Sequence, residues 1–136
     1  MNLYEIRLED NILYNTDLLD AFLFECQCAL FFVDMTNHKS FDPVKYMISK
    51  INKDKHKYPY LKIIIVENKI DLIPEIQNEE YQKYKNDNNN KNIDFITISI
   101  KTQNNLDILL NQVYNELSPN NSEKNLYRWA KYQNAF

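Results

Sequence analysis

The absence of glycine constrains this chain more than any other feature of its sequence. None of the 136 residues is glycine, whereas average usage of about 7% would give roughly nine or ten. Glycine turns the backbone through positive φ angles and lets main-chain amides approach a phosphate closely. Tight turns must therefore use asparagine or aspartate, which tolerate the left-handed region. A glycine-rich phosphate-binding loop cannot be built from these residues.

The length and the composition predict one compact intracellular domain. A chain of 136 residues that is 44% hydrophobic can build a single core. It contains no apolar run of about 18 residues and no basic flank followed by an apolar stretch and a cleavage site, so we expect it on the cytoplasmic side of membranes. The net charge of -3 is spread along the chain, and no basic block indicates nucleic acid as a partner.

The two cysteines predict neither a disulfide nor a metal site. Cys26 and Cys28 are two residues apart at the entry to a predicted strand, where their side chains would point to opposite faces. A zinc site needs about four ligands, and the only histidines, His38 and His56, lie in distant polar segments. We expect buried or half-buried free thiols and no metal.

The hydrophobic pattern predicts alternating strands and helices. Alternating or continuously apolar runs predict strands at 3–8, 28–33, 61–66 and 93–100. Helical spacing predicts helices at 16–26, 40–51 and 105–117, with a weaker one at 78–85. In the second of these, Asp42 precedes Pro43 at the first helical position. Asn105 is the predicted cap of the helix at 105–117, whose apolar stripe comprises Leu106, Leu109, Leu110, Val113 and Leu117.

This order of elements predicts an α/β fold with a mainly parallel sheet and helices on both faces. Residues 1–118 form the predicted domain, which includes a flexible asparagine-rich loop at 86–92. Residues 119–136 are expected to be a C-terminal tail or a short amphipathic helix. Ligands of such sheets bind where the strands end, at their carboxyl edge.

Two loops that follow predicted strands carry a family resemblance. Asn68-Lys69-Ile70-Asp71-Leu72 follows a buried strand and resembles the guanine-specificity motif of Ras/Rab-type small GTPases. Ser99-Ile100-Lys101-Thr102 resembles the family's SAK loop, with isoleucine in place of a small alanine. Residues 28–51 resemble the Rab-like pattern of an apolar strand, D-x-T-N-x-x-S-F-D and an amphipathic helix. The resemblance covers roughly residues 3–117.

The resemblance implies a truncated Ras-like domain of the P-loop NTPase type. In that family the aspartate accepts two hydrogen bonds from guanine, the lysine stem lies along the base, and the asparagine ties neighbouring loops together. A carboxylate suits guanine because the ring N–H and the amino group are both donors. The implied cofactor-binding residues are those of a vestigial guanine pocket: Asn68, Lys69, Asp71, Ser99 and Lys101.

The departures from the family pattern concern phosphate, metal and membrane anchoring. The family's first strand, which normally sits in the middle of the sheet, would precede Leu3 together with the phosphate loop, the first helix and the first switch. The D-x-x-G motif would fall near residues 9–13, which are EDNIL. Glu67 stands where the family has glycine, and it would repel phosphates if it faced the pocket. The terminal residues NAF contain no cysteine for a prenyl anchor.

These observations predict a pseudo-GTPase: a protein without catalytic residues or cofactor that serves as a structural or adaptor subunit. Without the family's first strand, the strand at 3–8 would pair directly with the strand at 28–33 or leave surface for a protein partner to cover. The alternative is a Rab-like GTP- or GDP-binding protein of vesicle trafficking, whose phosphate-binding elements come from a partner chain or a missing upstream segment. A purely structural role for the loops also stays open, with Asp71 capping a turn and Lys69 solvated.

Overall fold

The structure is a computed structural model, and it describes residues 2–7, 16–24, 26–74, 79–87, 92–118 and 128–133. The segment EDNIL at 9–13 lies outside these ranges, and so does most of the asparagine-rich loop, at 88–91. The predictions for those two segments therefore stay predictions. Within the described ranges, no helix combines the length and the apolarity needed to cross a membrane.

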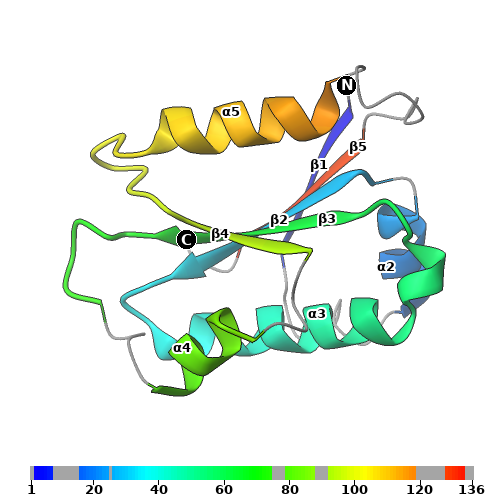
Figure 1. Cartoon of the computed structure of the whole chain (residues 1–136), viewed down its shortest axis with the longest axis horizontal. Coiled ribbons are helices and arrows are strands. Elements are labelled where there is room, and N and C mark those ends of the chain that lie inside the picture. The colour runs from blue at the N-terminus through cyan, green and yellow to red at the C-terminus, as the bar shows by residue number, and fades with distance from the viewer. Residues whose placement is uncertain are drawn as a thin grey trace.

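The core of the fold is a parallel five-stranded sheet with the order β1-β5-β2-β3-β4 (Figure 1). This confirms the predicted α/β class with a parallel sheet. The strands are β1 (Asn2–Arg7), β2 (Cys28–Asp34), β3 (Lys62–Asn68), β4 (Ile93–Thr97) and β5 (Arg128–Gln133).

Helices cover both faces of the sheet, as predicted. α2, α3 and α4 lie on one side, and α5 lies on the other (Figure 1). The helices are α2 (Thr16–Leu23), α3 (Asp42–Lys53), α4 (Glu79–Lys85) and α5 (Leu106–Leu117), with 3-10 turns at His38–Ser40 and Lys55–Lys57. α3 has Pro43 in its first turn, and its predicted apolar stripe is buried. Asp42 is the first residue of this helix and not its cap.

β2 and β3 are deeply buried strands. Every residue of β2 is buried, and so is every residue of β3 except Lys62. Continuous apolar sequence suits this position, because a strand of a parallel sheet with helices on both faces has no solvent side. The alternation of side chains divides the core into two clusters. Cys26 belongs to the cluster under α3, and Cys28 belongs to the cluster under α5; both are free and buried, as predicted.

The C-terminal segment corrects two predictions. Residues 128–133 form a strand and not part of a helix. This strand, β5, lies between β1 and β2 and is parallel to both. Hence β1 neither pairs with β2 nor leaves an open gap beside it. The physical reason is tertiary: the segment has ladder partners on both sides, and this hydrogen bonding outweighs the helical spacing of its apolar residues.

The apolar stripe of α5 is also narrower than its sequence predicts. Leu109 and Leu117 are buried against the sheet, and Leu106 and Val113 are partly buried. Leu110, however, is 64% exposed. Because α5 is the only described helix on its face of the sheet, this flank has no neighbouring helix among the described residues. Asn105 precedes the helix as predicted but makes no side-chain capping bond.

Candidate functional site

The candidate site lies at the carboxyl edge of the sheet, where β2, β3 and β4 end. The loop after β3 contains Lys69 to Leu72, and the loop after β4 contains Ser99 to Thr102. The strands are parallel and in register, so these loops leave the sheet side by side. The two segments singled out in the sequence are therefore neighbours in space.

The end of β2 holds the lysine of the first loop. Lys69 Nζ lies 2.6 Å from Asp34 Oδ2, and Asp34 Oδ1 accepts bonds from the backbone N–H and the hydroxyl of Thr36. Burial acts to raise the pKa of Asp34, but its bonds to Lys69 and Thr36 lower that pKa below the ordinary value. The ammonium of Lys69 is thus paired with a carboxylate of the protein itself.

Asn68 joins the three strand ends. Its side-chain oxygen accepts a hydrogen bond from Ile100 N at 3.1 Å, and its backbone carbonyl accepts one from Met35 N at 3.1 Å. The residue is buried, so these bonds satisfy groups that water does not reach. This arrangement matches the loop-tying role that the family resemblance implies for the asparagine.

Ser99 connects the two loops through Asp71. Its hydroxyl donates to Asp71 Oδ1 at 2.6 Å and accepts a bond from Thr102 N at 3.1 Å. The bond from Ser99 holds the pKa of Asp71 below its ordinary value, with smaller contributions from Lys101 and Lys69. Ser99 is fully buried, whereas Asp71 is exposed. The arrangement therefore presents an ionised carboxylate to solvent, as recognition of two donors on a base edge requires.

Three residues beside the site adopt the left-handed backbone conformation without being glycine. Lys69, Gln103 and Asn105 have φ angles of 67°, 61° and 59°. Asparagine was the expected substitute for glycine in such turns, and Asn105 fits that expectation. Lysine and glutamine have no such tolerance, and an ordinary residue in this region costs roughly 1–2 kcal/mol. Among the described residues, the positive φ angles all occur in the two loops of the candidate site, and backbone strain is often found at functional sites.

Glu67 faces away from this edge. Its side chain lies on the α4 side of the sheet, where its Oε1 accepts bonds from the Tyr81 hydroxyl at 2.6 Å and Lys85 Nζ at 2.9 Å. Its carboxylate is neutralised there, so it does not oppose phosphates at the carboxyl edge. In place of the family's glycine, the chain has a buried ion pair that joins β3 to α4.

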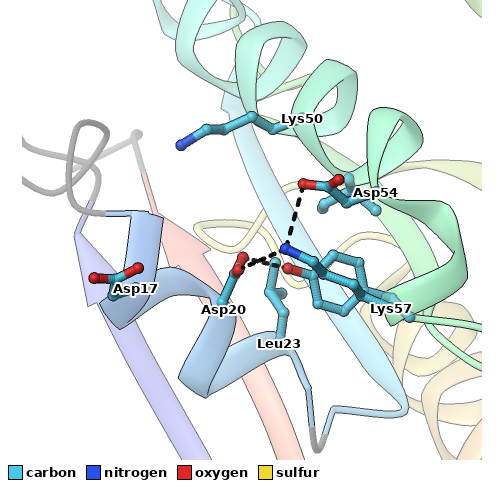
Figure 2. A pocket seen from close by; sticks show the side chains of 8 residues that line it. Asp17, Asp20, Leu23, Lys50, Asp54 and Lys57 are labelled. Carbon is cyan, nitrogen blue, oxygen red and sulfur yellow. Dashed lines mark hydrogen bonds and ion pairs between the residues drawn. The ribbon is translucent and has the colours of Figure 1, made fainter.

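A pocket of about 280 Å³ lies elsewhere, between α2 and the C-terminal end of α3. Lys57 lies between Asp20 and Asp54 (Figure 2). Its Nζ is 3.1 Å from a carboxylate oxygen of Asp20 and 3.7 Å from one of Asp54. The Tyr58 hydroxyl donates to Asp20 as well. This pocket is at the end of α3 that leads to the start of β3, opposite the edge where such sheets bind ligands. Lys57 is paired with Asp20 and Asp54, whereas the buried Nζ of Lys50 has no hydrogen-bond partner among the described residues. Its lining comprises Asp17, Asp20, Leu23, Lys50, Ile51, Asp54, Lys57 and Tyr58.

The structure brings the predicted site residues together. Ser99 is bonded to Asp71, Asn68 is bonded to the same loop through Ile100 N, and Lys69 is bonded to Asp34. Lys101 is exposed but close enough to affect the pKa of Asp71. Sequence reasoning missed Asp34 as a member of this group. Asp34 is the last residue of a buried strand, and this position at the carboxyl edge of the sheet could have indicated a site residue. Whether these residues bind guanine stays a prediction.

Comparison with known proteins supports the interpretation of these loops. The sequence model of the Ras family matches residues 14–119, which include both loops and most of the sheet. No curated protein sequence matches the chain. Because the family match spans well over half of the sequence and agrees with the fold and the loop geometry, the chain belongs to the Ras family and is a small GTPase-like protein.

Proposed function

We propose that this chain is a pseudo-GTPase: a Ras-like domain that does not hydrolyse GTP and serves as a structural or adaptor subunit. The observation that carries the proposal is the state of the lysine in the guanine motif. Lys69 Nζ is paired with Asp34 at 2.6 Å, and none of the 136 residues is glycine. The two loops that resemble a guanine pocket lie together, but the lysine of the motif is paired with Asp34, and the sequence has no glycine for a phosphate loop.

The base loops nevertheless supply the chemistry to bind guanine weakly. Asp71 offers an exposed carboxylate, and Ser99 fixes one of its oxygens. Such a site would recognise guanine through the N–H donors of the base, and the phosphates of a nucleotide would add no affinity. We therefore expect guanosine and GDP to bind with the same low affinity, whether or not Mg²⁺ is present.

Isothermal titration calorimetry with guanosine, GDP and GTP, each with and without Mg²⁺, tests this expectation. Asp71→Asn is the matched variant, because an amide replaces one acceptor oxygen with a donor at constant size. It should abolish whatever guanosine binding exists. GDP binding more than about tenfold tighter than guanosine, a difference of about 1.4 kcal/mol, would contradict the proposal, as would release of inorganic phosphate from GTP.

Exposed apolar side chains support the adaptor role. Leu110 and Tyr114, four residues apart on one flank of α5, are 64% and 71% exposed. Aromatic and large apolar residues are typical of interface cores, and positions four apart in a helix lie on the same side. This flank, and not a gap in the sheet, is the surface that we assign to a protein partner.

Affinity purification from native cells with two paired variants tests the assignment. Leu110→Glu with Tyr114→Glu should remove the partners that the wild-type chain retains. Asn111→Glu with Asn115→Glu, at exposed positions next along the same helix, adds the same charge and should leave them bound. Equal retention by both variants would exclude this flank of α5 as the interface.

A second candidate function is favoured by the assembled base loops. In it, a partner chain or an upstream segment supplies the phosphate-binding elements, and the complex binds GTP or GDP as Rab-like proteins of vesicle trafficking do. The calorimetric titration repeated with the purified native complex separates the two candidates. Tight, Mg²⁺-dependent GDP binding by the complex but not by the chain would favour this second function.

A further inference from the structure

The sheet contains a junction between two unequal parts. Among the described strands, β1 pairs only with β5, over six residue pairs from Asn2↔Arg128 to Arg7↔Gln133. β5 in turn is joined to β2 over five pairs, from Cys28↔Trp129 to Phe32↔Gln133. The β5–β2 ladder therefore connects β1 to β2, β3 and β4.

The two parts differ in composition. β2 and β3 contain the continuous apolar runs ALFFV and IIIV, which suit burial on both faces. β5 has the sequence RWAKYQ, in which three of six residues are polar or charged although the strand has a neighbour on each side. By composition, β5 offers less apolar area for burial than β2 or β3. Release of β5 would be a partial opening that leaves the β2–β3–β4 part folded.

Release of β5 exposes a specific acceptor. The edge of β2 would then present unpaired N–H and C=O groups, and the strand that fits them in register is β5 itself. A second copy of the chain carries that strand in identical form, and exchange of an identical element is a low-cost route to a dimer. Residues 118–127 connect α5 to β5 and, at about 3.3–3.6 Å per residue, can reach roughly 33–36 Å.

We propose that β5 exchanges between two copies of this chain, so that each copy's β5 lies between β1 and β2 of the other. This inference does not depend on the proposed function. The exchanged dimer contains the same strand pairs as the monomer, so concentration decides between them. The tether gives β5 an effective concentration of about millimolar for its own sheet, and refolding at comparable chain concentration should therefore yield the dimer.

Cysteine cross-linking between two different variants tests the exchange. One variant carries Arg7→Cys and the other Gln133→Cys, at positions that are register partners of β1 and β5. The mixture is unfolded, refolded at about 1 mM and oxidised with glutathione disulfide. Burial raises the pKa of the natural thiols Cys26 and Cys28 to about 12, so they stay protonated and unreactive. We expect a covalent dimer that contains one chain of each kind.

Arg128→Cys in place of Gln133→Cys is the control, because position 128 pairs with residue 2 at the opposite end of β1. It should give little covalent dimer with Arg7→Cys. Equal yields from both mixtures would overturn the proposal, since they indicate random collision. The double variant Arg7→Cys with Gln133→Cys in one chain reports on the monomer. If the double variant forms the disulfide within one chain while the mixture gives no covalent dimer at any concentration, β5 does not exchange. If neither the disulfide within one chain nor the covalent dimer forms, β5 does not lie beside β1.

Discussion

The ion pair that replaces the family's glycine gives the sharpest prediction about stability. The side chain of Glu67 is 2% exposed, and that of its partner Lys85 is 32% exposed. Removing the charge of Lys85 leaves a carboxylate inside the protein that, among the described residues, keeps the Tyr81 hydroxyl but no cation as a partner. Loss of one partner of a buried pair costs about 3–5 kcal/mol. Because Lys85 is partly solvated, we take the lower end of this range and predict that Lys85→Met lowers the free energy of unfolding by about 3 kcal/mol.

Removing the charge of Glu67 should lower the free energy of unfolding less than removing the charge of Lys85. In Glu67→Gln the side-chain oxygen still accepts a bond from Tyr81, and Lys85 can turn its ammonium toward water. We expect a loss of about 1 kcal/mol, the usual net contribution of one hydrogen bond. The double variant should also lie within about 1 kcal/mol of the wild type, because a neutral buried site needs no cation. Its stability would then exceed that of Lys85→Met alone.

Urea unfolding followed by circular dichroism measures these differences. With an m-value of about 2 kcal/mol/M, Lys85→Met should lower the midpoint by about 1.5 M. Lys83→Met removes the same charge at an exposed position of α4 and should change stability by no more than about 0.5 kcal/mol. Equal effects of the two lysine variants would refute the reasoning, and so would a greater loss from Glu67→Gln than from Lys85→Met.

Three further predictions concern the loops and the titratable groups. Gln103→Gly should raise stability by about 0.5–1 kcal/mol in the same urea assay, because removing the strain of a positive φ outweighs the entropy cost of glycine; a loss would contradict the observed φ of 61°. Since the pKa of Asp34 is lowered in the folded chain, its contribution to stability is complete above about pH 4 and is lost as the pH falls through the folded pKa. Lys69→Met should therefore make unfolding less pH-dependent between about pH 5 and pH 2, and an unchanged dependence would show that Lys69 does not hold this carboxylate. Tyr58→Phe should raise the pKa of Asp20, because the Tyr58 hydroxyl is the largest cause of its lowering; an NMR titration of the carboxyl carbon that shows no rise would exclude this bond.

The parts of the fold that could be predicted from the sequence are those with a repeated signal. The apolar runs of β2 and β3 and the stripe of α3 place several residues on one pattern, so a single exception does not hide it. The NKID segment could be interpreted because it directly follows such a strand. The loop geometry then follows from strands that are parallel and in register.

The parts that could not be predicted depend on contacts between distant residues. RWAKYQ fits a helix as well as a strand, and only the two ladders beside β1 and β2 decide between them. The orientation of Glu67 depends on Lys85, eighteen residues later, and no local pattern reveals that pair. Asp34 likewise gains its role from Lys69, which belongs to a different loop. Such pairings arise from packing and leave no periodicity in the sequence.

The position of β5 has a consequence for biosynthesis. Chains are made from the N-terminus, and domains commonly fold as they emerge, yet here β5, which is synthesised after β1, β2, β3 and β4, is the strand that attaches β1 to the rest of the sheet. Until β5 has left the ribosome, the edge of β2 has no neighbour on that side and is open to aggregation. Assembly of this sheet therefore waits for synthesis of β5.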